Sequence, residues 1–163
     1  MEHEAPAIFV ALEQSGFGAA IRRSPWIYPA ANVGHIIFLV SFAGAVAVMD
    51  VRLLGGLSST APGRLIAVAR RFAVVALVGM AATGSVLFTA EASHLATNPA
   101  LQLKAALLAA GLANVAIYEF WAKRAVEHLP PLAAMPARAR IAGALSLALW
   151  IGVAACGRSI AYF

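Results

Sequence analysis

Four long apolar stretches, separated by short polar segments, dominate the chain. They cover about residues 31–49, 72–92, 101–122 and 141–157, and charged side chains are scarce in all of them. About 20 apolar residues in an α-helix, which rises 1.5 Å per residue, cross the hydrocarbon layer of a bilayer, which is about 30 Å thick. The pattern therefore predicts an all-α integral membrane protein, in which four spanning helices pack as a four-helix bundle.

Residues 6–23 follow a different pattern, in which apolar and polar side chains recur at helical spacing. Glu13, Gln14, Arg22 and Arg23 lie on the polar side of such a helix. This segment is too polar to span a bilayer and is typical of an amphipathic helix in the membrane interface. Ser24 and Pro25 end it, so we expect a single membrane domain over residues 1–163, with an N-terminal interfacial helix before the bundle.

Composition supports a membrane protein. Hydrophobic residues make up 62% of the chain and charged residues 12%, whereas a soluble domain carries about 25% charged residues. The net charge of +5 would suit nucleic acid, but the basic residues gather at the ends of the apolar stretches, where they anchor helices. We therefore expect the lipid bilayer, and not nucleic acid, as the partner of this chain.

The distribution of basic residues predicts the orientation. Eight lysines and arginines lie between the first and second stretches or between the third and fourth, and four lie on the opposite side. The positive-inside rule places the richer side in the cytoplasm. In a bacterial-type inner membrane, both termini would then be periplasmic. The richer side holds Arg52, Arg64, Arg70, Arg71, Lys123, Arg124, Arg138 and Arg140, and the other holds Arg22, Arg23, Lys104 and Arg158.

Three potential metal ligands fall at the periplasmic ends of predicted helices. His35 lies about one turn into the first span, His94 lies just after the second, and Cys156 ends the fourth. Two histidines on facing helices can bind a b-type haem as axial ligands, and imidazole with thiolate suits copper. The same pattern also fits histidines that only bond to neighbouring helices, because no compact motif such as HxxxH is present.

Several residues around these ligands would complete such a site. The haem propionates would pair with Arg22, Arg23, Lys104 or Arg158. Glu91 precedes His94 by three residues and would orient its imidazole from one helical face.

A second group of charges lies at the opposite, cytoplasmic ends of the predicted helices. Asp50 and Arg52 end the first span, Arg70 begins the second, and Glu119 precedes Lys123 by one turn. We expect charge pairs that lock the helix ends together, with a proton or ion entrance as the alternative. Asn114, in the middle of the third span, is predicted to bond to a neighbouring helix.

A set of short motifs is shared with known proteins. The chain carries W-I-Y-P at 26–29, His35, D-V-R-L-L-G at 50–55, T-G-S-V-L-F at 83–88, N-P at 98–99, Lys104 and Asn114. Over about residues 8–125 it resembles a family of uncharacterised bacterial multi-pass membrane proteins. More distantly, it is similar to the membrane domain of copper-resistance D proteins and to cytochrome-b-type four-helix bundles. The first likeness implies copper and the second haem, at His35 first and His94 second.

Two functional hypotheses follow. No P-loop, GxSxG or HExxH motif occurs in the sequence, so no pattern here indicates an enzyme. The first hypothesis is a redox or metal-handling protein that exchanges electrons with a periplasmic redox protein or quinone, or passes copper. The alternative is a non-catalytic membrane subunit of a larger complex. A transporter would require several copies of the chain to form a substrate path.

Overall fold

The computed structural model describes residues 5–162, and the helices it contains confirm the all-α architecture. Four helices are long and apolar enough to cross a membrane. They are α3 (Ile27–Leu53), α4 (Pro62–Ala90), α6 (Pro99–Ile117) and α7 (Ala137–Ser159). A π-helical turn (Tyr118–Ala122) and a 3-10 turn (Lys123–Ala125) extend α6, and a further 3-10 turn (Ile160–Tyr162) follows α7.

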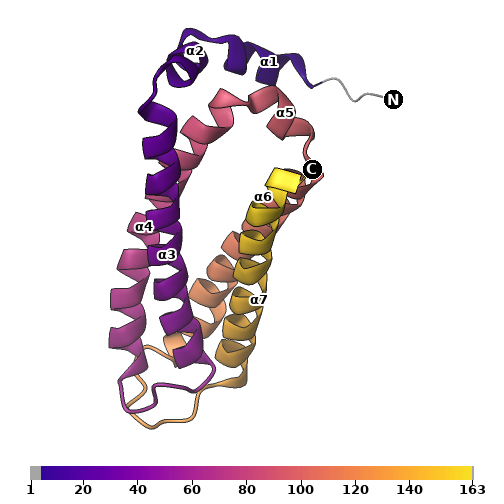
Figure 1. Ribbon diagram of the computed structural model, residues 1–163. Coiled ribbons are helices and arrows are strands. Elements are labelled where there is room, and N and C mark those ends of the chain that lie inside the picture. The colour runs from indigo at the N-terminus through magenta and orange to yellow at the C-terminus, as the bar shows by residue number, and fades with distance from the viewer. Residues whose placement is uncertain (1–4, 163) are drawn as a thin grey trace.

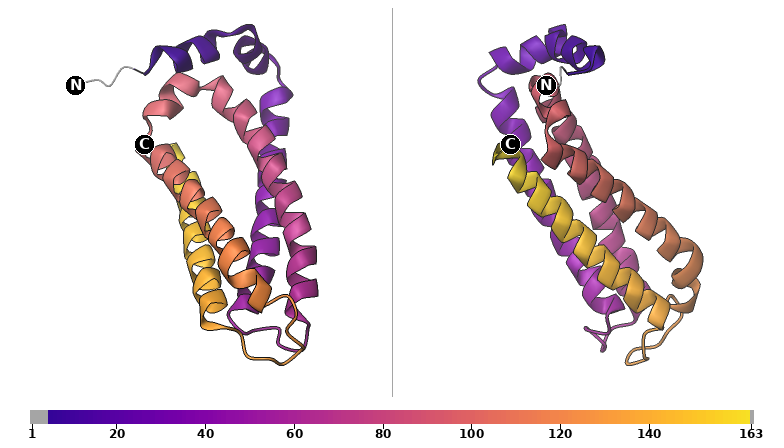
Figure 2. Two further views of the ribbon diagram at one scale, coloured as in Figure 1. Left: turned by 180° about the vertical axis from the view of Figure 1, so that it is seen from behind. Right: turned by 90° about the vertical axis from the view of Figure 1, so that its right-hand side faces the viewer.

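The four helices form two antiparallel hairpins. In one hairpin α3 packs along α4, in the other α6 packs along α7, and the main contact between the hairpins is α3 against α7. The hairpins lie together at the end that carries the connections 54–61 and 126–136, which we call the loop end (Figures 1 and 2). They diverge toward the other end, which we call the lid end, because α1, α2 and α5 lie across it (Figure 1).

Glycines allow the long helices to approach closely. A Cβ atom on Gly79 of α4 would lie 2.6 Å from ring atoms of Phe38 on α3. A Cβ on Gly143 of α7 would lie 2.9 Å from the Cβ of Leu53 on α3. Small residues serve this purpose in membranes, where van der Waals packing drives helix association. The α3–α7 contact is therefore closest near the loop end.

The Asn98-Pro99 pair starts α6 and connects it to the end of α7. The Asn98 side-chain oxygen accepts hydrogen bonds from the backbone N–H groups of Ala100 (3.0 Å) and Leu101 (3.1 Å). Proline at the first helical position needs no hydrogen-bond acceptor. Asn98 Nδ2 also donates to the Ile160 carbonyl oxygen at 3.1 Å. This buried side chain thus fixes the lid end of the second hairpin.

The amphipathic segment is helical, as expected, but the prediction of one continuous helix over residues 6–23 is wrong. It forms α1 (Ala7–Gln14) and α2 (Gly16–Arg23), which meet at Ser15. Ser15 has an extended backbone (ψ 159°), and its Oγ accepts from Gly18 N at 3.1 Å. Ile21 of α2 is fully buried, because α1 packs on α5 and α2 packs on α4. The segment therefore docks on the bundle.

The helix boundaries differ from the predicted spans in a systematic way. The helices α3 and α4 begin before residues 31 and 72, because hydropathy marks only the part of a helix that lies in hydrocarbon. The second predicted span, 72–92, crosses a break at Glu91, whose backbone (φ −140°, ψ 38°) ends α4. The residues after this break form the short helix α5 (Ala92–Thr97).

Candidate functional site at the lid end

His35 of α3 is held by a hydrogen bond to α4. Its Nδ1 lies 3.0 Å from Thr83 Oγ1, and that hydroxyl donates its proton to the Gly79 carbonyl oxygen at 2.7 Å. A hydroxyl has one proton to give, so when Thr83 donates to Gly79, His35 Nδ1 is the donor to Thr83 and Nε2 carries the free electron pair of the neutral imidazole. The contact orients the ring.

The Thr83-Gly84 motif of α4 packs against this histidine. A Cβ on Gly84 would lie 3.2 Å from His35 Cε1, so glycine leaves room for the flat imidazole. On the facing helix, a Cβ on Gly34 would lie 3.2 Å from Thr83 Cγ2. The motif residues His35 and Thr83-Gly84, which are 48 positions apart, therefore form one packed unit.

Lys104 and Cys156 supply further polar chemistry at the lid end. Lys104 projects from α6 onto α7, where its Nζ lies 3.4 Å from the position of a Cβ on Gly157. It is close enough to His35 for its charge to act on that imidazole, and Cys156 is close enough to act on Lys104. Both Lys104 and Cys156 are partly buried. Imidazole, ammonium and thiol groups from α3, α6 and α7 thus gather in one region.

His94 and Glu91 lie in a different environment. Both are exposed, and His94 sits on α5, where its charge acts on Glu13 of the lid. No hydrogen bond of the described residues joins either side chain to His35. The pairing of His94 with His35, and the role of Glu91 in orienting His94, therefore stay predictions.

The remaining charged candidates lie in or near the lid. Arg22 Nη1 donates to the Ala90 carbonyl oxygen at 3.2 Å and so caps the end of α4, whereas Arg23 is exposed. The Glu13 carboxylate accepts hydrogen bonds from the Ser93 hydroxyl and, at 2.8 Å, from Ser93 N. These two Ser93 donors, the hydroxyl first, hold the pKa of Glu13 below its ordinary value. Arg22 and Glu13 fasten the lid to α4 and α5.

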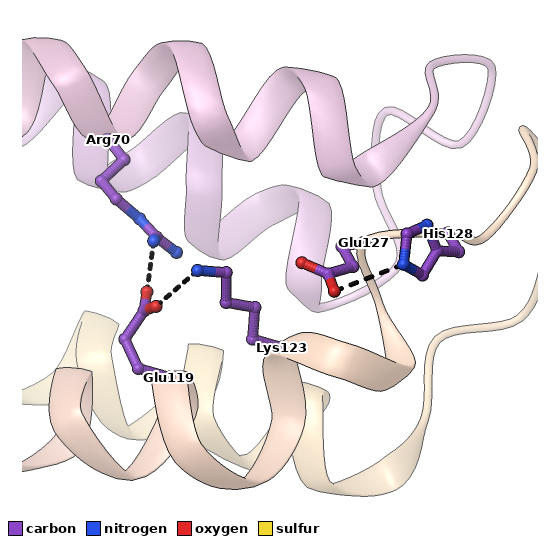
Figure 3. Close-up of polar contacts among 5 residues, drawn as sticks. All are labelled: Arg70, Glu119, Lys123, Glu127 and His128. Carbon is purple, nitrogen blue, oxygen red and sulfur yellow. Dashed lines mark hydrogen bonds and ion pairs between the residues drawn. The ribbon is translucent and has the colours of Figure 1, made fainter.

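The charge pairs expected at the opposite end are confirmed for Glu119. Figure 3 shows its carboxylate between two cations: Arg70 of α4 pairs with Oε1, and Lys123 Nζ lies 2.8 Å from Oε2. The Arg70 guanidinium also lies 5.9 Å from the centre of the Tyr118 ring. The figure further shows Glu127 and His128 paired at 3.4 Å in the connection that follows. The contacts of Arg70 with Glu119 and Tyr118 join α4 to the π-helical turn that extends α6 at the loop end.

Asp50 does not join these pairs, although the sequence pattern suggested that it would. It is only 2% exposed, and its Oδ2 has no hydrogen-bond partner among the described residues. It lines a cavity of about 230 Å³ between the two hairpins, together with Ser146, Asn114, Phe42 and Trp150. Sequence reasoning missed this cavity. The signal that was available is a lone carboxylate near the end of an otherwise apolar helix.

The fold and these sites define an α-helical membrane protein, built from two hairpins with a helical lid across one end. The chain belongs to a family of unknown function, DUF6644, which it matches over residues 13–163. No curated protein and no solved structure matches it. The family assignment agrees with the expected resemblance to uncharacterised membrane proteins, and it adds no support for the likeness to copper-resistance D proteins or cytochrome-b bundles.

Proposed function

We propose that this protein is a membrane redox protein that holds b-type haem at the lid end, with His35 as an axial ligand. The observation that carries the proposal is the hydrogen bond between His35 Nδ1 and Thr83 Oγ1. Histidines that bind metals commonly donate their second ring N–H to a fixed acceptor, which sets the tautomer and makes the other nitrogen a better ligand. Thr83 does this for His35 and leaves Nε2 available.

The surroundings of His35 suit such a group. His35 lies in the first turns of α3, toward the lid end, where the two hairpins diverge (Figure 1). Lys104 is the nearby cation that would pair with a propionate, because its charge acts on His35. Arg22 is less suited to that role than expected, since it already caps α4. His94 or a water molecule would supply the second ligand.

Copper is the alternative occupant, and one observation favours it. Cys156 and His35 both lie within the electrostatic reach of Lys104. A thiolate and an imidazole form a ligand pair suited to copper, with His94 as a third ligand. However, the described residues include no group of three or more His, Cys, Asp or Glu side chains arranged around a metal position. In this alternative, copper would therefore be held by His35 and Cys156 without a third ligand.

The orientation deduced from the basic residues would place the lid end on the periplasmic side of an inner membrane. A haem there would exchange electrons with a periplasmic redox protein, or with a larger membrane complex in which this chain is one subunit. Haem supplies the reversible one-electron step. The chain contributes the axial imidazole, its fixed tautomer and the apolar surroundings that tune the potential.

The test is a titration of purified protein with haemin, followed by the Soret band. We expect His35→Ala to abolish saturable binding, while His128→Ala does not change it, because His128 is an exposed histidine at the loop end. Thr83→Val removes the hydroxyl that accepts the hydrogen bond from His35 Nδ1 and should weaken binding about 10- to 100-fold. Wild-type affinity in His35→Ala would refute the site.

A parallel titration with Cu(I) separates the two occupants. The occupant is copper and not haem if wild type shows no Soret band but binds copper stoichiometrically. In that case both His35→Ala and Cys156→Ser should lose the copper. A protein that takes up neither would fit the alternative of a non-catalytic membrane subunit.

A further inference from the structure

We propose that the cavity near the loop end binds a small lipophilic ammonium ion, with Asp50 as its counter-charge. This site is independent of the proposed cofactor at the lid end, because it is built from other residues in the other half of the bundle. Its polar lining comes from Asp50 of α3, Ser146 of α7 and Asn114 of α6, together with the Arg70–Glu119 ion pair.

None of the ion pairs among residues 5–162 includes Asp50. Its carboxyl group is almost fully buried, and Oδ2 has no hydrogen-bond donor among the described residues. Arg70 also lines the cavity, but it is paired with Glu119, which is paired with Lys123 as well. Arg52 follows Asp50 by two residues, so it lies on another face of α3, and its Nε donates to the Thr60 carbonyl oxygen at 3.2 Å.

An isolated charge in an apolar surrounding is costly, so a buried carboxyl group without a partner either takes up a proton or needs a cation beside it. A cation from outside the chain would offset this cost. An anion would meet the carboxylate of Asp50 in the cavity, and a neutral apolar molecule would leave it unpaired. The carboxylate therefore selects for a positively charged ligand.

The rest of the cavity suits an apolar body of modest size. Its walls include Phe42, Trp150 and Tyr118, and the rings of Phe42 and Trp150 meet edge to face, with centroids 4.6 Å apart. Aromatic faces attract ammonium groups. An apolar cavity of about 150 Å³ holds one benzene ring, so the 230 Å³ here admits a benzyl or bicyclic ammonium ion.

The cavity opens toward the bilayer between α4 and α6. These two helices are not packed along each other, and we call the boundary between them the α4–α6 seam. Three apolar side chains on these helices line the cavity and are about half exposed: Val74 (54%), Leu112 (51%) and Val115 (44%). At the loop end the seam is bridged by the Arg70–Glu119 ion pair (Figure 3). A ligand would therefore reach Asp50 through the lipid, which requires a lipophilic cation.

The experiment compares two probes of the same shape, benzyltrimethylammonium and uncharged neopentylbenzene, by titration calorimetry with the full chain in nanodiscs. Ala73→Leu, which fills the cavity wall, provides the baseline for partition into lipid. We expect the cation to bind wild type at least tenfold more tightly than the neutral probe. Asp50→Asn should remove this preference, and Glu127→Gln, which removes a carboxylate outside the cavity, should retain it.

Three outcomes would overturn the proposal: equal binding of both probes to wild type, an unchanged cation preference in Asp50→Asn, or no binding above the Ala73→Leu baseline. If Asp50→Asn fails to fold, comparing the two probes on wild type and on Ala73→Leu still tests whether the cavity prefers the cation. A stable dimer that covers the α4–α6 seam and binds no cation would assign the cavity to a second copy of the chain instead.

Discussion

Replacing Gly79 by alanine would remove the space that the Phe38 ring occupies between α3 and α4. The added Cβ would lie 2.6 Å from three atoms of that ring. Ordinary van der Waals contact begins near 3.4 Å, so the ring or the helices must move by most of an ångström. Because α3 and α4 form the most extensive helix pair in the protein, this strain falls on the central contact of the first hairpin.

The expected loss of stability is measured against a matched control substitution. Gly44→Ala, on α3, adds the same methyl group where no heavy atom lies within 4 Å. Both substitutions gain the helix propensity of alanine over glycine, about 1 kcal/mol. The difference between them therefore isolates the overpacking cost, which is about 1–3 kcal/mol. Gly79→Ala should be less stable than Gly44→Ala by that amount.

The assay is unfolding by sodium dodecyl sulfate in mixed micelles, followed by circular dichroism. Adding Phe38→Leu to Gly79→Ala should restore part of the loss, because residues in direct contact couple by about 0.5–3 kcal/mol. If Gly79→Ala proves at least as stable as Gly44→Ala, the close α3–α4 contact is wrong.

Three further predictions concern polar contacts. Asn114→Ala removes the 3.0 Å hydrogen bond to the Ala142 carbonyl and should cost about 0.5–2 kcal/mol in the same unfolding assay; no loss would mean that it does not join α6 to α7. Lid docking should be retained above the ordinary carboxyl pKa of Glu13 and lost as pH falls through its lowered value, because protonation weakens acceptance from Ser93. Hydrogen exchange in α1 should rise at that pH, and Glu13→Gln should show the rise already at neutral pH; a pH-independent exchange rate would contradict this. Glu119→Gln should loosen α4 from α6 and raise hydrogen exchange in the π-helical turn, whereas unchanged exchange would show that the ion pairs are not structural.

Much of the architecture could be predicted because hydropathy reports which segments can lie in lipid. The four long helices were predicted in this way, and so were the hydrogen bond of Asn114 to a neighbouring helix and the Glu119–Lys123 pair. The last two depend on rules that act within or between neighbouring helices, such as the i, i+4 spacing and the cost of an unpaired amide in an apolar layer.

The features that were missed depend on which face of each helix meets which neighbour. A membrane helix is apolar all round, so its periodicity does not reveal its packed side. The His35–Thr83 contact joins residues 48 positions apart, and the Glu13–Ser93 contact joins residues 80 apart. Asp50 was expected among charge pairs, because the sequence places other charges at the same level of the bundle. Only the packing shows that Arg70, Glu119 and Lys123 pair with one another, whereas Asp50 lines the cavity without a cation bound to it.

The central claim is that His35 holds a redox cofactor at the lid end. It is tested most directly by an optical spectrum of the protein, purified after expression with haem precursor and copper supplied, before and after reduction with dithionite. The account predicts a Soret band that shifts on reduction, at about one haem per chain, and that disappears in His35→Ala but persists in His128→Ala. A colourless wild-type protein without bound metal, or an identical spectrum in His35→Ala, would contradict it.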